Sequence, residues 1–192
     1  MKSLRHKCLS KALGYSLVEM MMTLAIGLIL VSVALPTMIG AIQGYRLNSV
    51  AQQVANLAEL TRYTAIRRNS VISLRQVVQN GNTILFVDLD GDGNLGATEP
   101  LVMLPSDMQL ANGQSLTPPA ASIGQPTQDF AGQIIFDYRG TVYYTGGGPM
   151  TAYFLALGYT NQAQYGCRAI TVSPMGQTKT WKAPAGGTWT GM

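Results

Sequence analysis

Four acidic residues within twelve positions are the densest group of possible metal ligands in this chain. Residues 88–99 read DLDGDGNLGATE, and the acids are Asp88, Asp90, Asp92 and Glu99. They occupy the first, third, fifth and twelfth positions, with glycine at the sixth, which is the spacing of an EF-hand calcium loop. Because Ca²⁺ prefers six to eight hard oxygen ligands, these carboxylates make it the candidate cofactor.

A turn without metal is the alternative interpretation of the same twelve residues. EF-hand loops connect two helices, whereas the segments 83–87 and 101–104 on either side favour strands. Both interpretations remain open from the sequence.

A second group of side chains, near the C-terminus, combines cations with aromatic rings. Its members are Arg168, Lys179, Trp181 and Lys182, and Arg139, Tyr165 and Trp189 are possible additions. Proteins bind single-stranded nucleic acid with such groups, since cations attract phosphates and rings stack on bases. The alternative is that the rings pack between strands and the cations are solvated.

The chain lacks the residues on which much enzyme chemistry depends. It has one histidine, His6, and two cysteines, Cys8 and Cys167. Removal of the first 14 residues would leave no imidazole and a single thiol, so Ser-His and Cys-His nucleophile pairs are not available. We therefore expect no enzyme activity and no intrachain disulfide.

Charge is distributed unevenly along the chain. The formal net charge is +4, and four cations precede every acidic residue: Lys2, Arg5, Lys7 and Lys11. Without residues 1–14, the remaining cations equal the acids in number, so the formal net charge is zero. The basic character of the whole chain is therefore no evidence for nucleic-acid binding.

An uncharged segment, Met20–Tyr45, follows these cations. Its apolar part, Met20–Ile42, is long enough to cross a membrane, for which about 20 apolar residues suffice. Cations that precede a membrane span keep their side in the cytoplasm. We therefore expect residues 1–14 to be cytoplasmic and the C-terminal part of the chain to lie on the opposite side.

Glu19 is an acid at the start of this apolar segment. A carboxylate costs on the order of 2.5–3.5 kcal/mol at the centre of a bilayer, so such a residue needs a partner. If the chain is cut after Gly14, the new amino group of Tyr15 lies about one helical turn from Glu19. The amine of a neighbouring copy could then pair with this carboxylate. A cleaved secretory signal and a plain anchor are the alternatives, and the long apolar segment with its acid disfavours both.

The remainder of the chain is predicted to form an α+β fold. The first helix continues over 43–69, because Leu47, Val50 and Val54 recur at helical spacing, and Asn69 favours its end. Strands are predicted at 71–78, 83–87, 101–104, 133–137, 141–144, 152–157, 168–173 and 177–182. Asn80-Gly81 predicts a hairpin turn, and residues 105–132 are predicted to form a surface loop.

Residues 14–19, GYSLVE, resemble the prepilin signal of type IV pilins and type II secretion pseudopilins. The resemblance implies that the prepilin peptidase cuts after Gly14 and that Tyr15 becomes the methylated first residue. It also implies that Glu19 is the assembly acid and that Pro36 is the proline that commonly kinks a pilin helix. Tyr15 stands where the family usually has phenylalanine, so an aromatic residue is kept.

Later segments are similar to the GspH/FimT family of minor pseudopilins. The similarity lies in residues 60–69 (LTRYTAIRRN), 135–140 (IFDYRG) and 170–176 (ITVSPMG). It implies a pilin-like fold, in which a long N-terminal helix packs on a C-terminal antiparallel sheet. The expected parts are a cleaved leader 1–14, a transmembrane and filament-core helix 15–42, its amphipathic continuation 43–69 and a periplasmic head domain 70–192.

The function implied by this resemblance is that of a minor subunit that primes or caps a type IV pilus or a secretion pseudopilus. Its expected partners are other pilin subunits, the prepilin peptidase, the assembly platform of the bacterial inner membrane, and membrane lipid before extraction. DNA uptake is the alternative, because some FimT-type proteins use a Gly-Arg-x-Arg stretch. The aligned residues here, Gly176-Gln177-Thr178-Lys179, keep one of its two cations.

Overall fold

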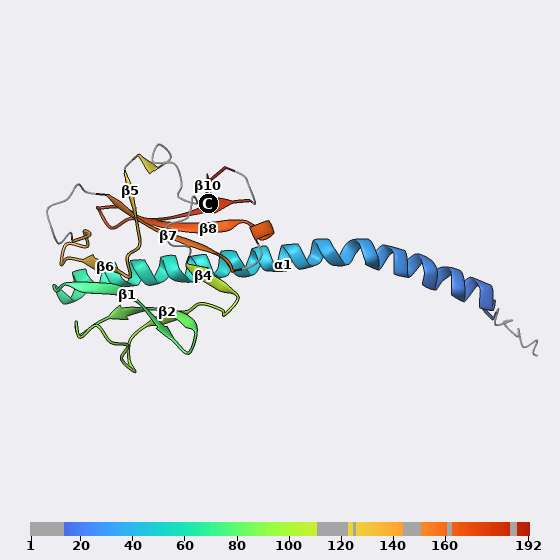
Figure 1. The fold of residues 1–192 in the computed structure, drawn as a ribbon, viewed down its shortest axis with the longest axis horizontal. Helices are drawn as coiled ribbons and strands as arrows, with labels where there is room; N and C mark the ends of the chain where they lie inside the picture. Colours follow the sequence, from blue (N-terminus) through green and yellow to red (C-terminus); the bar gives the residue numbers. More distant parts are fainter. Residues whose placement is uncertain (1–13, 111–122, 125, 144–150, 161–162, 185–187) are drawn as a thin grey trace, which may run out of the picture. The chain divides into compact units, whose positions relative to one another are not determined.

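The computed structural model describes residues 14–110, 123–124, 126–143, 151–160, 163–184 and 188–192 (Figure 1). The chain divides into two compact units, Met1–Ala41 and Ile42–Met192. Helix α1, Leu17–Arg68, belongs in part to each of them. The predicted positions 1–13, 111–122, 125 and Tyr144 fall outside the described residues.

Helix α1 ends where the sequence predicts. Asn69 follows it with a left-handed φ of 48°. The amide of Asn69 donates to the carbonyl of Ile66 at 3.2 Å, and the amide of Ser70 donates to that of Ala65 at 3.2 Å. These are the two hydrogen bonds of a Schellman motif, which satisfies carbonyls that a helix end leaves without partners.

A four-stranded antiparallel sheet has the order β3-β2-β1-β6. Its strands are β1 (Ile72–Gln79), β2 (Asn82–Asp88), β3 (Leu101–Met103) and β6 (Gln133–Phe136). The turn between β1 and β2 has positive φ at both Asn80 (51°) and Gly81 (78°), which confirms the predicted hairpin.

The second sheet has the order β10-β9-β8-β7-β4, and β5 pairs with β7 in parallel. The strands are β4 (Met108–Leu110), β5 (Thr127–Asp129), β7 (Ala152–Tyr159), β8 (Cys167–Val172), β9 (Thr178–Ala183) and β10 (Thr190–Gly191). A short 3-10 helix, Ala163–Tyr165, precedes β8. Apart from β5, neighbouring strands in both sheets run antiparallel.

Two predictions on the strands are corrected. Residues 105–132 are more than a surface loop: they contain β4 and β5, and they bury Met108 (4% exposed) and Phe130 (2% exposed). The predicted strand at 141–144 is reduced, within its described residues, to a single bridge between Phe136 and Val142. The first error concerns residues that pair with β7, a strand far away in the sequence.

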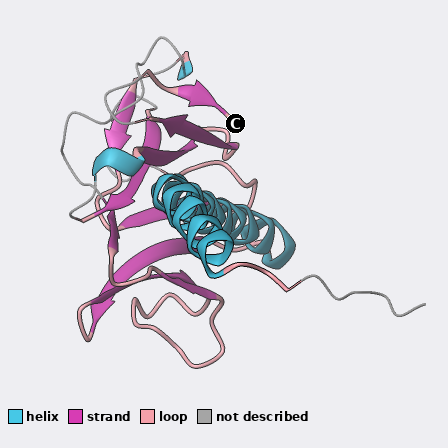
Figure 2. Ribbon diagram, turned by 90° about the vertical axis from the view of Figure 1, so that its right-hand side faces the viewer, coloured by secondary structure: helices cyan, strands magenta, loops and turns pink. Residues whose placement is uncertain are grey.

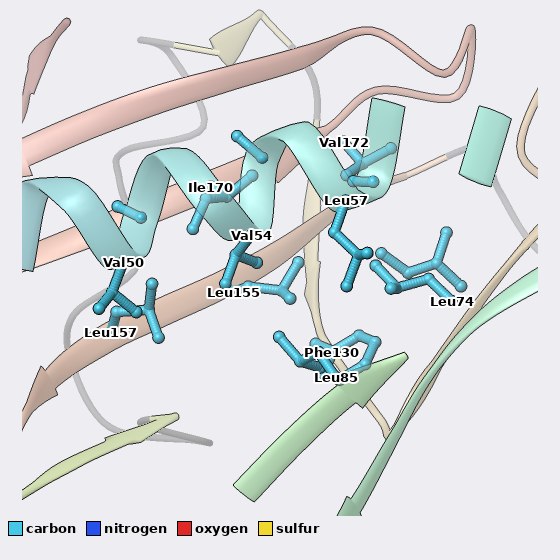
Figure 3. Close-up of a cluster of buried hydrophobic side chains, with 14 of the residues drawn as sticks. Val50, Val54, Leu57, Leu74, Leu85, Phe130, Leu155, Leu157, Ile170 and Val172 are labelled. Carbon is cyan, nitrogen blue, oxygen red and sulfur yellow. The ribbon is translucent and has the colours of Figure 1, made fainter. Parts of the chain in front are cut away.

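The core of the second unit lies between α1 and the two sheets. Figure 2 shows the strands along one side of the helix. Buried side chains of α1 contact apolar side chains of both sheets, as the close-up in Figure 3 shows for Val54, Leu57, Leu74, Leu85 and Ile170. The fold is therefore α+β with one helix packed on antiparallel sheets, as predicted.

Candidate functional site

The residues of the predicted prepilin signal lie at the start of α1. Gly14 to Ser16 precede the helix, and Glu19 is in its first turn. An acid at this position is favourable, because the amide groups of the first turn carry partial positive charge. Tyr15 is 80% exposed. The carboxylate of Glu19 has no hydrogen bond or ion pair to any residue that the structure describes.

The three hydroxyl groups in the apolar half of α1 are satisfied within the helix. The hydroxyls of Thr23, Ser32 and Thr37 donate to the carbonyls three residues earlier, at 3.0, 2.7 and 2.8 Å. An apolar window of α1 has a mean hydropathy of 2.3, and α1 is long and apolar enough to cross a membrane. Pro36 lies inside the helix, which continues through it. This segment is therefore suited to lipid or to a filament core, where unpaired polar groups are costly.

The acidic loop brings three of its four predicted metal ligands together. Carboxylate oxygens of Asp88, Asp90 and Glu99 lie within 4.8 Å of one another. Asp92 is outside this group. The amide and side chain of Asn94 donate to its carboxylate, and these bonds lower the pKa of Asp92. The loop also uses left-handed backbone angles at Gly91 (80°) and Gly93 (77°).

The two buried acids of this loop already have donors from the protein. Asp88 is 1% exposed, and its carboxylate accepts hydrogen bonds from the Gly91 amide at 2.7 Å and the Ser73 hydroxyl at 3.2 Å. It also pairs with Arg75, whose Nε lies 2.7 Å away. The carboxylate of Glu99 accepts hydrogen bonds from the backbone amides of Leu89 (2.7 Å) and Gly96 (2.8 Å). These contacts hold the loop closed without metal, so the calcium site stays a prediction.

The C-terminal cations lie on two opposite faces of one sheet. Arg168 is paired in register with Lys182, and Ala169 with Trp181. Since side chains alternate along a strand, Arg168 and Lys182 share one face, and Lys179 and Trp181 share the other. The first face is toward α1, because Thr180, on the same side of β9 as Lys182, accepts a hydrogen bond from Gln52 of that helix.

Two of the four predicted nucleic-acid contacts are buried. Arg168 is 3% exposed, and its guanidinium donates to the Asn48 side chain and to the Cys167 carbonyl. Burial lowers the pKa of Arg168 and raises that of the Cys167 thiol. Trp181 is 4% exposed, and its indole N–H donates to the Thr171 hydroxyl at 3.0 Å. The four residues that the sequence groups as cations and rings therefore do not form one exposed face.

Lys179 remains at the surface beside a hollow on the outer face of the sheet. The hollow measures about 290 Å³ and is lined by Ile123, Thr171, Ser173, Met175, Gln177, Thr178, Lys179 and Trp181. The ammonium nitrogen of Lys179 lies 4.3 Å from the centre of the Trp181 ring, which is cation–π geometry. Among the described residues, Lys179 and Trp181 are therefore a predicted cation and a predicted ring that lie next to each other.

The three segments that carry the resemblance to GspH/FimT proteins converge at the C-terminal end of α1. Arg62 Nε donates to the Gly140 carbonyl at 3.0 Å, and the Val142 amide donates to that of Pro174 at 2.9 Å. A Cβ atom on Gly176 would lie 2.1 Å from the Gly140 oxygen and 2.9 Å from Arg62 Nε. Spacing alone does not predict this junction, although each segment is recognisable as a motif.

Comparisons with known proteins found one family model and two solved structures that are similar to this chain. A family model described as type II transport protein GspH matches residues 50–176. No match was found among curated proteins. Two crystal structures of the type IV minor pilin FimU of Pseudomonas aeruginosa strain PAO1 are similar at 16% and 17% identity, both with a TM-score of 0.47. Each similarity covers 76% of this chain, and 92% and 97% of the respective FimU chains. Because the family model spans more than half of its residues, the chain belongs to the GspH family of type II transport proteins.

Proposed function

We propose that this chain is a minor pilin or pseudopilin, a structural subunit that joins a filament through α1 and primes or caps its assembly. The observation that carries the proposal is Glu19. It stands in the first turn of an apolar helix and has no partner among the described residues. A carboxylate in such surroundings is stabilised by a cationic partner, and the described residues supply none.

The partner in this proposal is the N-terminal amine of a neighbouring subunit. The prepilin peptidase cuts after Gly14, and the amino group of Tyr15 becomes the new terminus. Before extraction, α1 anchors the protein in the bacterial inner membrane, with its head domain in the periplasm. After extraction, the exposed apolar side chains of residues 17–42 pack against the same segment of other subunits. The proposed role of the protein is therefore filament assembly rather than catalysis.

The experiment is co-purification of full-length variants with the filament in a host that carries the secretion or pilus machinery. Glu19→Ala is expected to reduce incorporation by more than tenfold while leader removal proceeds normally. Glu59→Ala is the matched control, because Glu59 is an exposed acid of the same helix in its soluble half. Normal incorporation of Glu19→Ala would contradict the pairing of this acid with an amine.

DNA binding is a second candidate, favoured by the position of Lys179 over the ring of Trp181. Its test is fluorescence anisotropy of the full chain in detergent with single-stranded DNA at low and physiological salt. Lys179→Ala is expected to weaken binding, whereas Lys182→Ala, on the other face of the strand, is expected to leave it unchanged. Binding that responds equally to both variants, or no binding at low salt, would exclude this site.

A further inference from the structure

A second hollow lies beside the first turns of α1 in the Ile42–Met192 unit. It measures about 330 Å³ and is lined by Arg46, Ser49, Val50, Pro105, Asp107 and Met108. Val50 and Met108 give it an apolar floor, since they are 8% and 4% exposed, and Arg46 and Asp107 are exposed at its rim. The hollow therefore combines an apolar surface with one cation and one anion.

The two charges at this rim have no partners within the described residues. Among the described residues, the only ion pair joins Arg75 and Asp88, which lie outside this hollow. The guanidinium of Arg46 and the carboxylate of Asp107 therefore do not pair with each other. Neither side chain makes a hydrogen bond, although the backbone carbonyl of Asp107 accepts one from the Thr160 amide. The hollow thus presents a separated positive and negative charge to a ligand.

Tyr159 lies close enough to both charges to be affected by each of them. Its hydroxyl contacts the backbone and side chain of Gln43 on α1. Burial raises the pKa of this phenol, the nearby carboxylate of Asp107 raises it further, and Arg46 opposes the change. Both charges of the rim therefore lie near Tyr159, whose hydroxyl contacts α1 at Gln43, the residue after Ile42.

We propose that this hollow binds the headgroup of a zwitterionic phospholipid that carries a primary ammonium. Arg46 binds the phosphate, Asp107 binds the ammonium, and the apolar floor covers the glycerol and the first methylene groups. A bilayer of about 40–45 Å has a hydrocarbon core of about 30 Å, so each polar layer is several ångströms thick. Arg46 follows Ile42 by four residues, a rise of about 6 Å along a helix, which places it in that layer.

The chemistry of the site distinguishes among headgroups. An anionic phosphatidylglycerol supplies the phosphate for Arg46 but only neutral hydroxyl groups for Asp107, whose carboxylate is repelled by the net negative headgroup. A phosphatidylcholine has the positive charge but no N–H donor for the carboxylate. Phosphatidylethanolamine satisfies both groups, and we expect the site to prefer it. The inference rests on the membrane anchoring in the proposed function, and it adds a specific lipid to it.

The experiment is native mass spectrometry of the full-length protein released from micelles with equal amounts of these three lipids. The wild type is expected to retain phosphatidylethanolamine about fivefold more than phosphatidylglycerol, the scale of one exposed charge pair. Asp107→Asn should abolish this preference, and Arg46→Gln should reduce the retention of all three lipids. Asp129→Asn and Lys182→Gln are controls that change exposed charges elsewhere on the chain.

The outcomes separate this inference from the proposed function. Equal retention of the three lipids, a preference for phosphatidylglycerol, or an unchanged pattern in Asp107→Asn would overturn the headgroup site. Normal, Glu19-dependent incorporation in the same preparation would leave the assembly role in place. Melting temperatures of the variants confirm folding, and Arg46→Lys, which keeps the cation, is expected to retain lipid as the wild type does.

Discussion

Single residues in this protein depend on partners supplied by distant segments. Asp88, at the end of β2, is neutralised by Arg75 from β1, and Arg168 in β8 is held by Asn48 from α1. Each contact places a charge where water cannot solvate it fully. The stability of the head domain therefore depends on individual pairs, and their removal has measurable consequences.

Arg75→Ala is expected to destabilise the protein by about 1–3 kcal/mol, because it leaves the buried Asp88 carboxylate without its cation. The value is below that of a fully buried pair, since the Arg75 side chain is 34% exposed. Urea unfolding followed by tryptophan fluorescence measures it. Arg139→Ala is the control, and an equal effect of the two substitutions would show that the ion pair contributes nothing.

Cys167 is expected to react slowly with alkylating reagents at neutral pH. Burial raises the pKa of its thiol, so the fraction present as reactive thiolate is lower than in a free cysteine until the pH exceeds that raised value. The measurement is the alkylation rate between pH 7 and pH 10.5 in a Cys8→Ser background. A rate that levels off below pH 8.5 would contradict the raised pKa.

At the scale of elements, two tight turns that follow strands pack against the C-terminal part of the helix. The turns at Gly140 and Gly176 have left-handed angles of 77° and 75°, and they touch each other and Arg62. The acidic loop between β2 and β3 depends in the same way on its own donors. Each turn is specified locally by glycine or aspartate, and each is fixed in place by a neighbouring element.

Gly176→Ala is expected to destabilise the fold by at least about 2–4 kcal/mol, because the new methyl group would overlap the Gly140 carbonyl. Gly81→Ala is the matched control. Its φ of 78° is similar, and nothing lies within 4 Å of the new atom, so it should cost only about 1–2 kcal/mol. Thermal unfolding compares the two variants, and equal losses would mean that the close contact at Gly176 is unimportant.

The calcium hypothesis predicts that millimolar Ca²⁺ raises the melting temperature of the protein. The geometry refines this test, because Asp90 lies in the group of three carboxylates and Asp92 lies outside it. Asp90→Ala should abolish the calcium effect, whereas Asp92→Ala should weaken it less. Asp107→Asn serves as the control. The absence of any shift with Ca²⁺ relative to a chelator would identify the loop as a plain turn.

The whole molecule combines two units with different surroundings. The first carries apolar side chains on its surface, and the second has a buried core formed by α1 and both sheets. Membership of the GspH family and the apolar length of α1 describe a membrane-anchored subunit. In the proposed function, leader removal at the N-terminus precedes the transition from membrane to filament.

Gly14→Ala is expected to slow leader removal, because the resemblance to prepilins makes this glycine the residue before the cleaved bond. The precursor should accumulate as a slightly larger band on a denaturing gel. Glu19→Ala is the control for cleavage, since it is expected to be processed at the normal rate. Complete processing of Gly14→Ala at the wild-type rate would show that the peptidase reads other residues.

Local sequence patterns are sufficient for the elements that depend on neighbouring residues. The apolar run predicts the first half of α1, the helical spacing of Leu47, Val50 and Val54 predicts the second, and Asn80-Gly81 predicts the hairpin. The same applies to the end of the helix at Asn69. These features need no knowledge of the rest of the chain, because their determinants are backbone preference and periodicity.

Only the tertiary structure shows which side chains meet. The register of β8 and β9 separates Arg168 from Lys179, and the loop geometry excludes Asp92 from the other three acids. Burial of Met108 and Phe130 within a polar segment follows from pairing with a strand more than twenty residues later. The physical reason is that long-range contacts depend on the packing of whole elements. A residue's type and sequence neighbours therefore reveal its possible chemistry, and the assembled sheets decide whether it is buried, paired or exposed.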